Sequence, residues 1–193
     1  QDDDIFQETR FRFLRVMKGI IWEKYESSQI SGEAANLLVE SVNVNLDSTT
    51  SPINLWPFLY EYFTSFKSIK FLFKIKDFFL IGRFAKRFIA GHLAFIYEVT
   101  TAFIQVCEEI MEMEGNIPLS KYHIKSVVEE FDKNKMDATT YIVSLEDTFA
   151  DIIKAIQVYR ASNTILEYQK HFLSEMLASG QIEEKEYNEL RRD

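Results

Sequence analysis

The sequence predicts an all-α protein, a multi-helix bundle with two long helices. The chain of 193 residues has three prolines and six glycines, too few for the closely spaced turns of a β-sandwich or barrel. Hydrophobic residues make up 47% and charged residues 27%, which is ordinary for a folded globular chain. Apolar residues recur at helical spacing over about 83–113 and 147–178, and these stretches are the two long helices.

The first part of the chain predicts an N-terminal helical pair over 4–46. In residues 4–28 apolar residues recur at helical spacing with mostly basic residues between them, as in an amphipathic helix. Ser31 is the expected N-cap of the second helix, roughly 32–46. Two turn-forming serines, at positions 27 and 28, separate the two helices.

A loop is expected over 47–56, where Asp, Ser, Thr and Pro residues cluster. Pro57 suits the first turn of a short helix that continues to about Lys67. Residues 68–81 fit both a strand and a helix; because no partner strand is visible elsewhere, we expect a helix. The helices expected in the rest of the chain are 83–113, 120–131, 135–145, 147–178 and 182–192. Gly180 lies where a helix C-cap glycine belongs.

We expect residues 1–193 to form a single helical domain with a main bundle over 57–193. No stretch has the roughly 20 mostly apolar residues that cross a bilayer. The chain begins with an acidic segment that resembles no signal peptide and lacks an initiator methionine. We therefore expect it to be a fragment of a longer protein.

The net charge of −8 argues against nucleic acid as a partner, because neutralising phosphates requires a basic surface. One block is nevertheless basic, and it contains Lys67, Lys70, Lys74, Lys76, Arg83, Lys86 and Arg87. Interleaved with phenylalanines, this block is typical of a face that binds an anionic lipid surface or an acidic partner. A solvated face above a Phe-rich core is an equally simple interpretation.

Residue patterns that carry enzyme chemistry are absent from the sequence. The three histidines have no second His or Cys one helical turn away, and Cys107 is the single cysteine. The stretch from Asp132 to Asp137 imitates the start of a calcium loop, but Met136 replaces an oxygen ligand and Asp137 replaces the glycine that the turn needs. We therefore expect no catalytic residues, no metal and no cofactor.

A motif near the N-terminus is more specific. Arg10, Arg12, Phe13, Leu14 and Trp22 lie in a segment that resembles the one following the membrane domain in sodium/proton exchangers of the plant salt-tolerance type and the related sperm type. The similarity continues through Ala34-Ala35-Asn36 and Leu46-Asp47 and returns in the segment from Gly180 to Glu186. Ile21 replaces the tyrosine usual before Trp22, and Ser27-Ser28-Gln29 replaces an acidic-Gly turn.

The resemblance implies a cytosolic regulatory and dimerisation module that couples the transport domain to a downstream regulatory domain, on the cytoplasmic side of a membrane. It implies a homodimer and contact with the membrane domain of the same chain. The 83–113 helix, apolar on more than one face, also predicts self-association. The alternative function is a helical scaffold or accessory subunit of an assembly unrelated to exchangers.

Overall fold

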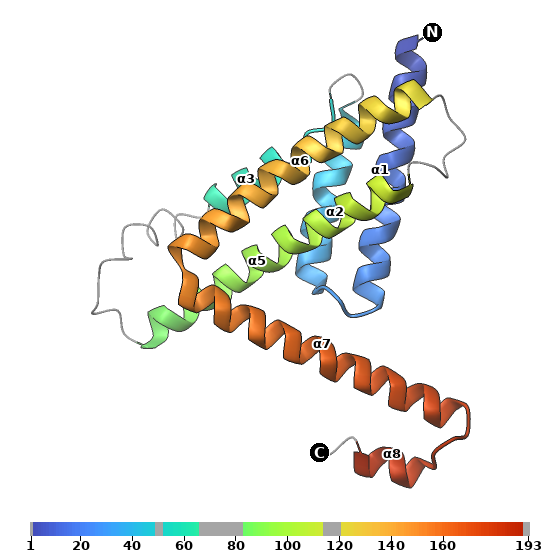
Figure 1. Ribbon diagram of the computed structural model, residues 1–193, viewed down its shortest axis with the longest axis vertical. Coiled ribbons are helices and arrows are strands. Elements are labelled where there is room, and N and C mark those ends of the chain that lie inside the picture. Colours follow the sequence, from blue (N-terminus) through green and yellow to red (C-terminus); the bar gives the residue numbers. More distant parts are fainter. Residues whose placement is uncertain (1, 49–51, 66–82, 114–120, 191–193) are drawn as a thin grey trace. The chain divides into compact units, whose positions relative to one another are not determined.

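The computed structural model describes residues 2–48, 52–65, 83–113 and 121–190, with side chains from 4–48, 52–65, 90–113 and 122–190. All regular secondary structure in these residues is helical, so the all-α prediction is confirmed. The helices are α1 (Asp2–Glu26), α2 (Gly32–Asp47), α3 (Leu55–Ser65), α5 (Arg83–Glu112), α6 (Lys121–Thr148), α7 (Ala150–Ala178) and α8 (Glu184–Leu190) (Figure 1). The helix expected over 68–81 lies outside the described residues.

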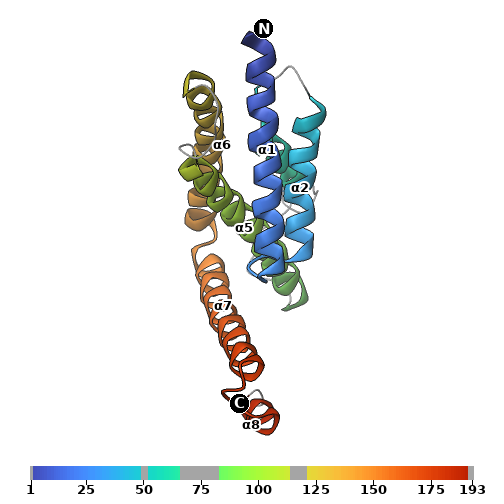
Figure 2. The same cartoon turned by 90° about the vertical axis from the view of Figure 1, so that its right-hand side faces the viewer.

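The expected domain 1–193 contains two compact units, residues 1–153 and 154–193. In the first unit α5 packs along α6, and α1 packs against α2. Helix α5 also contacts both α1 and α2, which lie beside one another as it crosses them (Figure 2). Helix α3 contacts α2 and α6. The core of the bundle is therefore enclosed by four long helices and α3.

The apolar residues of α5 explain its central position. Its buried side chains include Leu93, Ile96, Val99, Phe103, Val106 and Ile110. Their spacing of three and four residues forms a stripe that α1, α2 and α6 cover. The apolar character of α5 over these residues is thus accounted for within one chain and does not by itself require a second copy.

The turn between α1 and α2 contains both a confirmed cap and a backbone exception. The Ser31 side chain accepts a hydrogen bond from the Ala34 amide at 3.2 Å, so Ser31 is the N-cap that the sequence predicted. Ser28 has a φ of 58°, in the left-handed region that glycine usually occupies after a helix. Hydrogen bonds from Ser28 N to Tyr25 O and from Gln29 N to Lys24 O close the turn around it.

One prediction was wrong in α6. The helices expected over 120–131 and 135–145 form one continuous helix. The polar run that resembled a break contains Asn134, whose side chain is 3% exposed and faces the bundle. Asn134 lies between the buried residues Phe131 and Ala138, so it occupies a position in the inward stripe of an unbroken helix.

Aromatic rings fill the junction of α3, α5 and α6. Trp56 lies within 5.8 Å of Phe103 and 5.4 Å of Tyr141, measured between ring centroids. Phe63 stacks on Tyr141 at 6.0 Å, and Tyr60 meets the same ring edge-on at 5.6 Å. The Tyr141 hydroxyl oxygen is buried and has no hydrogen-bond partner among the described residues. Burial raises the pKa of Tyr141 to about 12, and the neighbouring Tyr60 acts in the same direction.

The second unit contains α7 from Lys154 onward and α8. Gly180 has a φ of 71°, and Gln181 N donates to Met176 O at 2.9 Å, so the predicted C-cap glycine is confirmed. At the start of α8, the Glu186 carboxylate accepts from Glu183 N at 3.0 Å, which satisfies one of the amides that a helix start leaves free.

Candidate functional site

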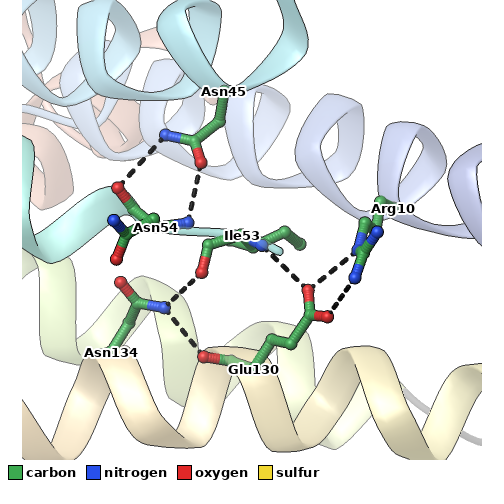
Figure 3. A network of polar contacts seen from close by, with 6 residues as sticks. All are labelled: Arg10, Asn45, Ile53, Asn54, Glu130 and Asn134. Atoms are coloured by element: carbon green, nitrogen blue, oxygen red, sulfur yellow. Dashed lines mark hydrogen bonds and ion pairs between the residues drawn. The ribbon is translucent and has the colours of Figure 1, made fainter. Parts of the chain in front are cut away.

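Four polar side chains lie around the segment from Ile53 to Trp56, where the chain enters α3. Figure 3 shows them with Ile53 and Asn54. They are Arg10 from α1, Asn45 from α2, and Glu130 and Asn134 from α6. We call these four residues the polar cluster. The polar cluster joins three helices and one extended segment through side-chain hydrogen bonds.

Arg10 and Glu130 form a bidentate ion pair. Arg10 Nε lies 3.0 Å from Glu130 Oε2, and Nη2 lies 2.5 Å from Oε1. The two side chains are 14% and 17% exposed, so the pair is largely shielded from water. The guanidinium carbon lies 4.2 Å from the centroid of the Phe6 ring, on the same helix. Two parallel hydrogen bonds fix the position of α1 relative to α6 more closely than a single contact would.

Glu130 and Asn134 also hold the extended segment. Glu130 Oε2 accepts from Ile53 N at 2.9 Å. Asn134 Oδ1 accepts from Trp56 N at 2.8 Å, while Asn134 Nδ2 donates to Ile53 O at 2.9 Å and to Glu130 O at 2.8 Å. Asn134 therefore pairs with the segment through both ends of its amide. This pairing explains a buried asparagine inside a helix.

Asn45 binds the segment from the other side. Its Oδ1 accepts from Asn54 N at 2.8 Å, and its Nδ2 donates to Ser41 O at 2.9 Å and to Asn54 O at 3.5 Å. Together with Glu130 and Asn134, it gives both backbone groups of Ile53 and of Asn54 a side-chain partner. A segment without secondary structure is thereby fixed at the helix junction.

The structure divides the five motif residues between the bundle and the surface. Arg10 belongs to the polar cluster, and Phe13 and Leu14 are buried, with Phe13 6.0 Å from the Phe131 ring. Arg12 is about half exposed and pairs with Glu8 on the same helix at 2.8 Å. Trp22 is 36% exposed and lies 5.9 Å from the Tyr25 ring. The motif is thus in part the surface by which α1 packs on α6.

Two acidic residues of α5 hold the end of α1 and the start of α2. Glu109 accepts from Lys24 Nζ at 2.5 Å, and the Lys24 side chain is 9% exposed. Glu98 accepts from both the amide and the hydroxyl of Ser31, at 2.8 and 3.2 Å. Helix α1 is therefore held near its start by α6 and near its end by α5.

The predicted basic face is not tested by these residues. Lys67, Lys70, Lys74 and Lys76 lie outside the described residues. Arg83, Lys86 and Arg87 lie in the first turns of α5, where side chains are not described. The basic face stays a prediction.

Sequence reasoning missed Asn45, Glu130 and Asn134. The available signal was Asn134, which follows the apolar Phe131 and precedes Ala138 at the spacing of one helix face. The polar run around Asn134 resembles the start of a calcium loop but lacks its ligands, and in the structure it lies within the continuous α6. Cys107 is fully buried, and burial raises the pKa of its thiol. Among the described residues, no group of three His, Cys, Asp or Glu side chains is placed to hold a metal ion.

None of the described helices combines the length and the apolar character that crossing a membrane requires. No protein-family model matches the chain. The chain is 22% identical over 187 residues, 96% of its length, to "Sodium/hydrogen exchanger 7" of Arabidopsis thaliana. It is 22% identical over 191 residues, 98% of its length, to "Sodium/hydrogen exchanger 8" of the same plant. The chain spans 16% and 25% of the lengths of these proteins. Nearly the whole chain is thus distantly similar to part of two sodium/hydrogen exchangers.

Proposed function

We propose that this chain is a cytosolic regulatory and dimerisation module of a sodium/proton exchanger, which couples a transport domain to a downstream regulatory domain. The observation that carries the proposal is the similarity of nearly the whole chain to a short part of two much longer exchangers. The exchanger resemblance of the Arg10–Trp22 segment, found from the sequence alone, points to the same family.

The arrangement of α1 supports a coupling role. In the family resemblance, this segment follows the transport domain. In the bundle, Arg10 and Phe13 fasten α1 to α6, and Lys24 fastens it to α5. A displacement of α1 would therefore act on α5 and α6 together, and through Glu130 on the entry to α3. These contacts would let the bundle transmit a movement of α1 to the other helices, as a coupling module requires.

A test of this role compares Arg10→Lys with Arg12→Lys in the full-length protein. Both changes keep the charge and remove the guanidinium fork, but Arg10 is in the polar cluster and Arg12 is at the surface. We expect Arg10→Lys to alter sodium-driven proton movement in reconstituted vesicles, with Arg12→Lys behaving like the wild type. Unchanged transport and unchanged regulation after removal of the entire module would refute the proposal.

The basic block is proposed as the lipid-facing part of the module. Each basic residue close to an anionic surface contributes on the order of 1 kcal/mol, screened by salt. Reversing Lys70, Lys74 and Arg87 to Glu should abolish salt-sensitive binding to anionic vesicles. If vesicles do not bind and the reversal instead weakens folding or dimerisation, the block faces acidic protein. If neither property changes, the block is a solvated face.

The alternative is a helical interaction subunit unrelated to exchangers. The apolar side chains exposed on α7, such as Tyr159 and Phe172, suit an interaction subunit as well. The sequence that precedes Gln1 in the gene separates the two functions, because an exchanger requires about a dozen apolar membrane segments there. A short or polar upstream sequence would favour the interaction subunit.

A further inference from the structure

Helix α7 presents large apolar side chains to solvent along the second unit. Those more than half exposed are Val158, Tyr159, Ile165, Leu166, Tyr168 and Phe172. Leu173 and Met176 continue the apolar face toward the end of the helix. So many large apolar side chains exposed along one helix favour a binding site for another macromolecule.

The spacing of these residues indicates that the occupant is another helix. Val158, Ile165 and Phe172 follow one another at intervals of seven residues, and so do Tyr159, Leu166 and Leu173. Between these two rows runs a third with the same interval, which consists of Ala155, Ser162, Gln169 and Met176. A strict seven-residue repeat keeps a stripe facing a partner helix that winds around it with a left-handed supercoil.

The opposite side of α7 is polar, and its charges do not favour a lipid surface. The residues there are Gln157, Arg160, Thr164, Glu167, His171 and Ser174. A helix that lies on an anionic membrane carries lysines and arginines along its polar face. Here Glu167 lies one turn before the cation Lys170 and pairs with it at 2.6 Å, and Glu175 lies one turn after His171. The charges on the polar face of α7 therefore favour binding to another protein over binding to a membrane surface.

We propose that this partner is α7 of a second copy, packed antiparallel about a two-fold axis beside Ile165. Val158 lies seven residues before Ile165 and Phe172 lies seven residues after it. In an antiparallel pair Val158 of one copy therefore faces the larger Phe172 of the other. Ala155 and Met176 lie ten residues before and eleven after, and they pair in the same way. Ser162 comes opposite Gln169, which brings two polar groups of the stripe together.

Charge distinguishes this arrangement from a parallel one. Lys154 lies eleven residues before Ile165 and Glu175 lies ten after it, so an antiparallel pair brings opposite charges together at both ends. A parallel pair in register would instead keep Lys154 and Glu175 of the two copies at opposite ends of the stripe, so neither would meet its opposite charge. The stripe from Ala155 to Met176 is about 33 Å long at the rise of an α-helix. The inference rests on the dimerisation part of the proposed function and supplies its contact surface.

The test is the oligomeric state of the whole chain, measured by sedimentation equilibrium. The wild type should dimerise at tens of micromolar or below. Ile165→Glu places two carboxylates against each other at the axis, and the dissociation constant should rise at least 100-fold. The matched control is Thr164→Glu, which introduces the same charge at the neighbouring position on the polar face and should leave the constant within threefold. Both residues are exposed, so circular dichroism of the two variants should equal that of the wild type.

Cysteine cross-linking tests the antiparallel direction. Ile165→Cys should form a disulfide-linked dimer under mild oxidation, whereas Val158→Cys and Phe172→Cys should each fail alone and succeed when mixed. Cross-linking of all three single variants would show a parallel pair and overturn the proposal. The unmodified chain is the control, since its Cys107 is fully buried.

Charge reversal gives a rescue experiment. Lys154→Glu and Glu175→Lys should each weaken the dimer, and the two together should restore it. A wild-type chain that stays monomeric, or a dimer that survives Ile165→Glu, overturns the α7 pairing. Neither result affects the coupling role, which depends on transport by the full-length protein, so the two proposals can fail separately.

Discussion

Replacing Glu130 by Gln should lower the free energy of unfolding by about 2 to 4 kcal/mol. The Glu130 carboxylate accepts two hydrogen bonds from Arg10 and one from the amide of Ile53. Glutamine keeps one acceptor oxygen, and its amide NH₂ would face donors. It also leaves the guanidinium of Arg10, whose side chain is 14% exposed, without its counter-ion.

The magnitude follows from the burial of the pair. A hydrogen bond to a charged group contributes roughly 1.5 to 3 kcal/mol. Removing one partner of a fully buried ion pair costs about 3 to 5 kcal/mol. Because both side chains of this pair keep some contact with water, the expected loss of about 2 to 4 kcal/mol stays below the upper end of these figures. The control is Glu8→Gln, which breaks the exposed pair with Arg12 and should cost less than about 0.5 kcal/mol.

Urea unfolding followed by circular dichroism measures both variants under the same conditions. A double-mutant cycle with Arg10→Met and Glu130→Leu adds a second comparison. The double variant should lose less than the sum of the single losses, because no unpaired charge remains. If Glu130→Gln and Glu8→Gln destabilise equally, the polar cluster does not hold α1 to α6 as argued.

Three further predictions concern single positions. Ser28→Gly should raise the free energy of unfolding by about 0.5 to 1 kcal/mol in a thermal melt, because Ser28 has a φ of 58° that glycine adopts without strain; unchanged or lower stability would contradict the turn geometry. Tyr141 has a pKa of about 12 in the folded chain, so an unfolded chain loses this proton first and stability should fall as pH rises from about 10 to 12, by up to about 2 kcal/mol. Tyr141→Phe should reduce that fall and be neutral or stabilising below pH 9; an equally steep fall in the variant would contradict it. Cys107 should react with a thiol reagent only after unfolding, since it is fully buried and burial raises its pKa; rapid labelling of the folded chain would be the opposite result.

The sequence predicted most helix boundaries because their signals are local. Ser31 and Gly180 lie at helix ends, Pro57 lies in a first turn, and each acts on residues within four positions of itself. The wrong break in α6 shows the limit of such signals. The polar run around Asn134 resembles a turn because its buried role depends on Ile53 and Trp56, about 80 residues earlier in the chain.

The polar cluster could not be predicted for the same reason. Arg10 and Glu130 are separated by 120 residues, and the sequence around one residue does not predict that the other is its partner. The motif around Arg10 indicated that the segment was specific, but not what it contacts. Phe13 could be assigned to the core by periodicity, whereas the partner of Arg10 required the packing of α1 on α6.

The division between apolar and polar contacts suggests how the bundle could transmit a displacement. Phe13 against Phe131 is a contact between apolar rings, and packed helices can slide past one another by small amounts at such contacts. The bidentate pair of Arg10 and Glu130 does not allow such sliding, because its two hydrogen bonds require one register of α1 on α6. Glu130 also binds the amide of Ile53, so a shift that broke the pair would change the environment of the segment that enters α3. A displacement of α1 would therefore act through a contact with two distinct states, intact or broken, instead of one that yields gradually.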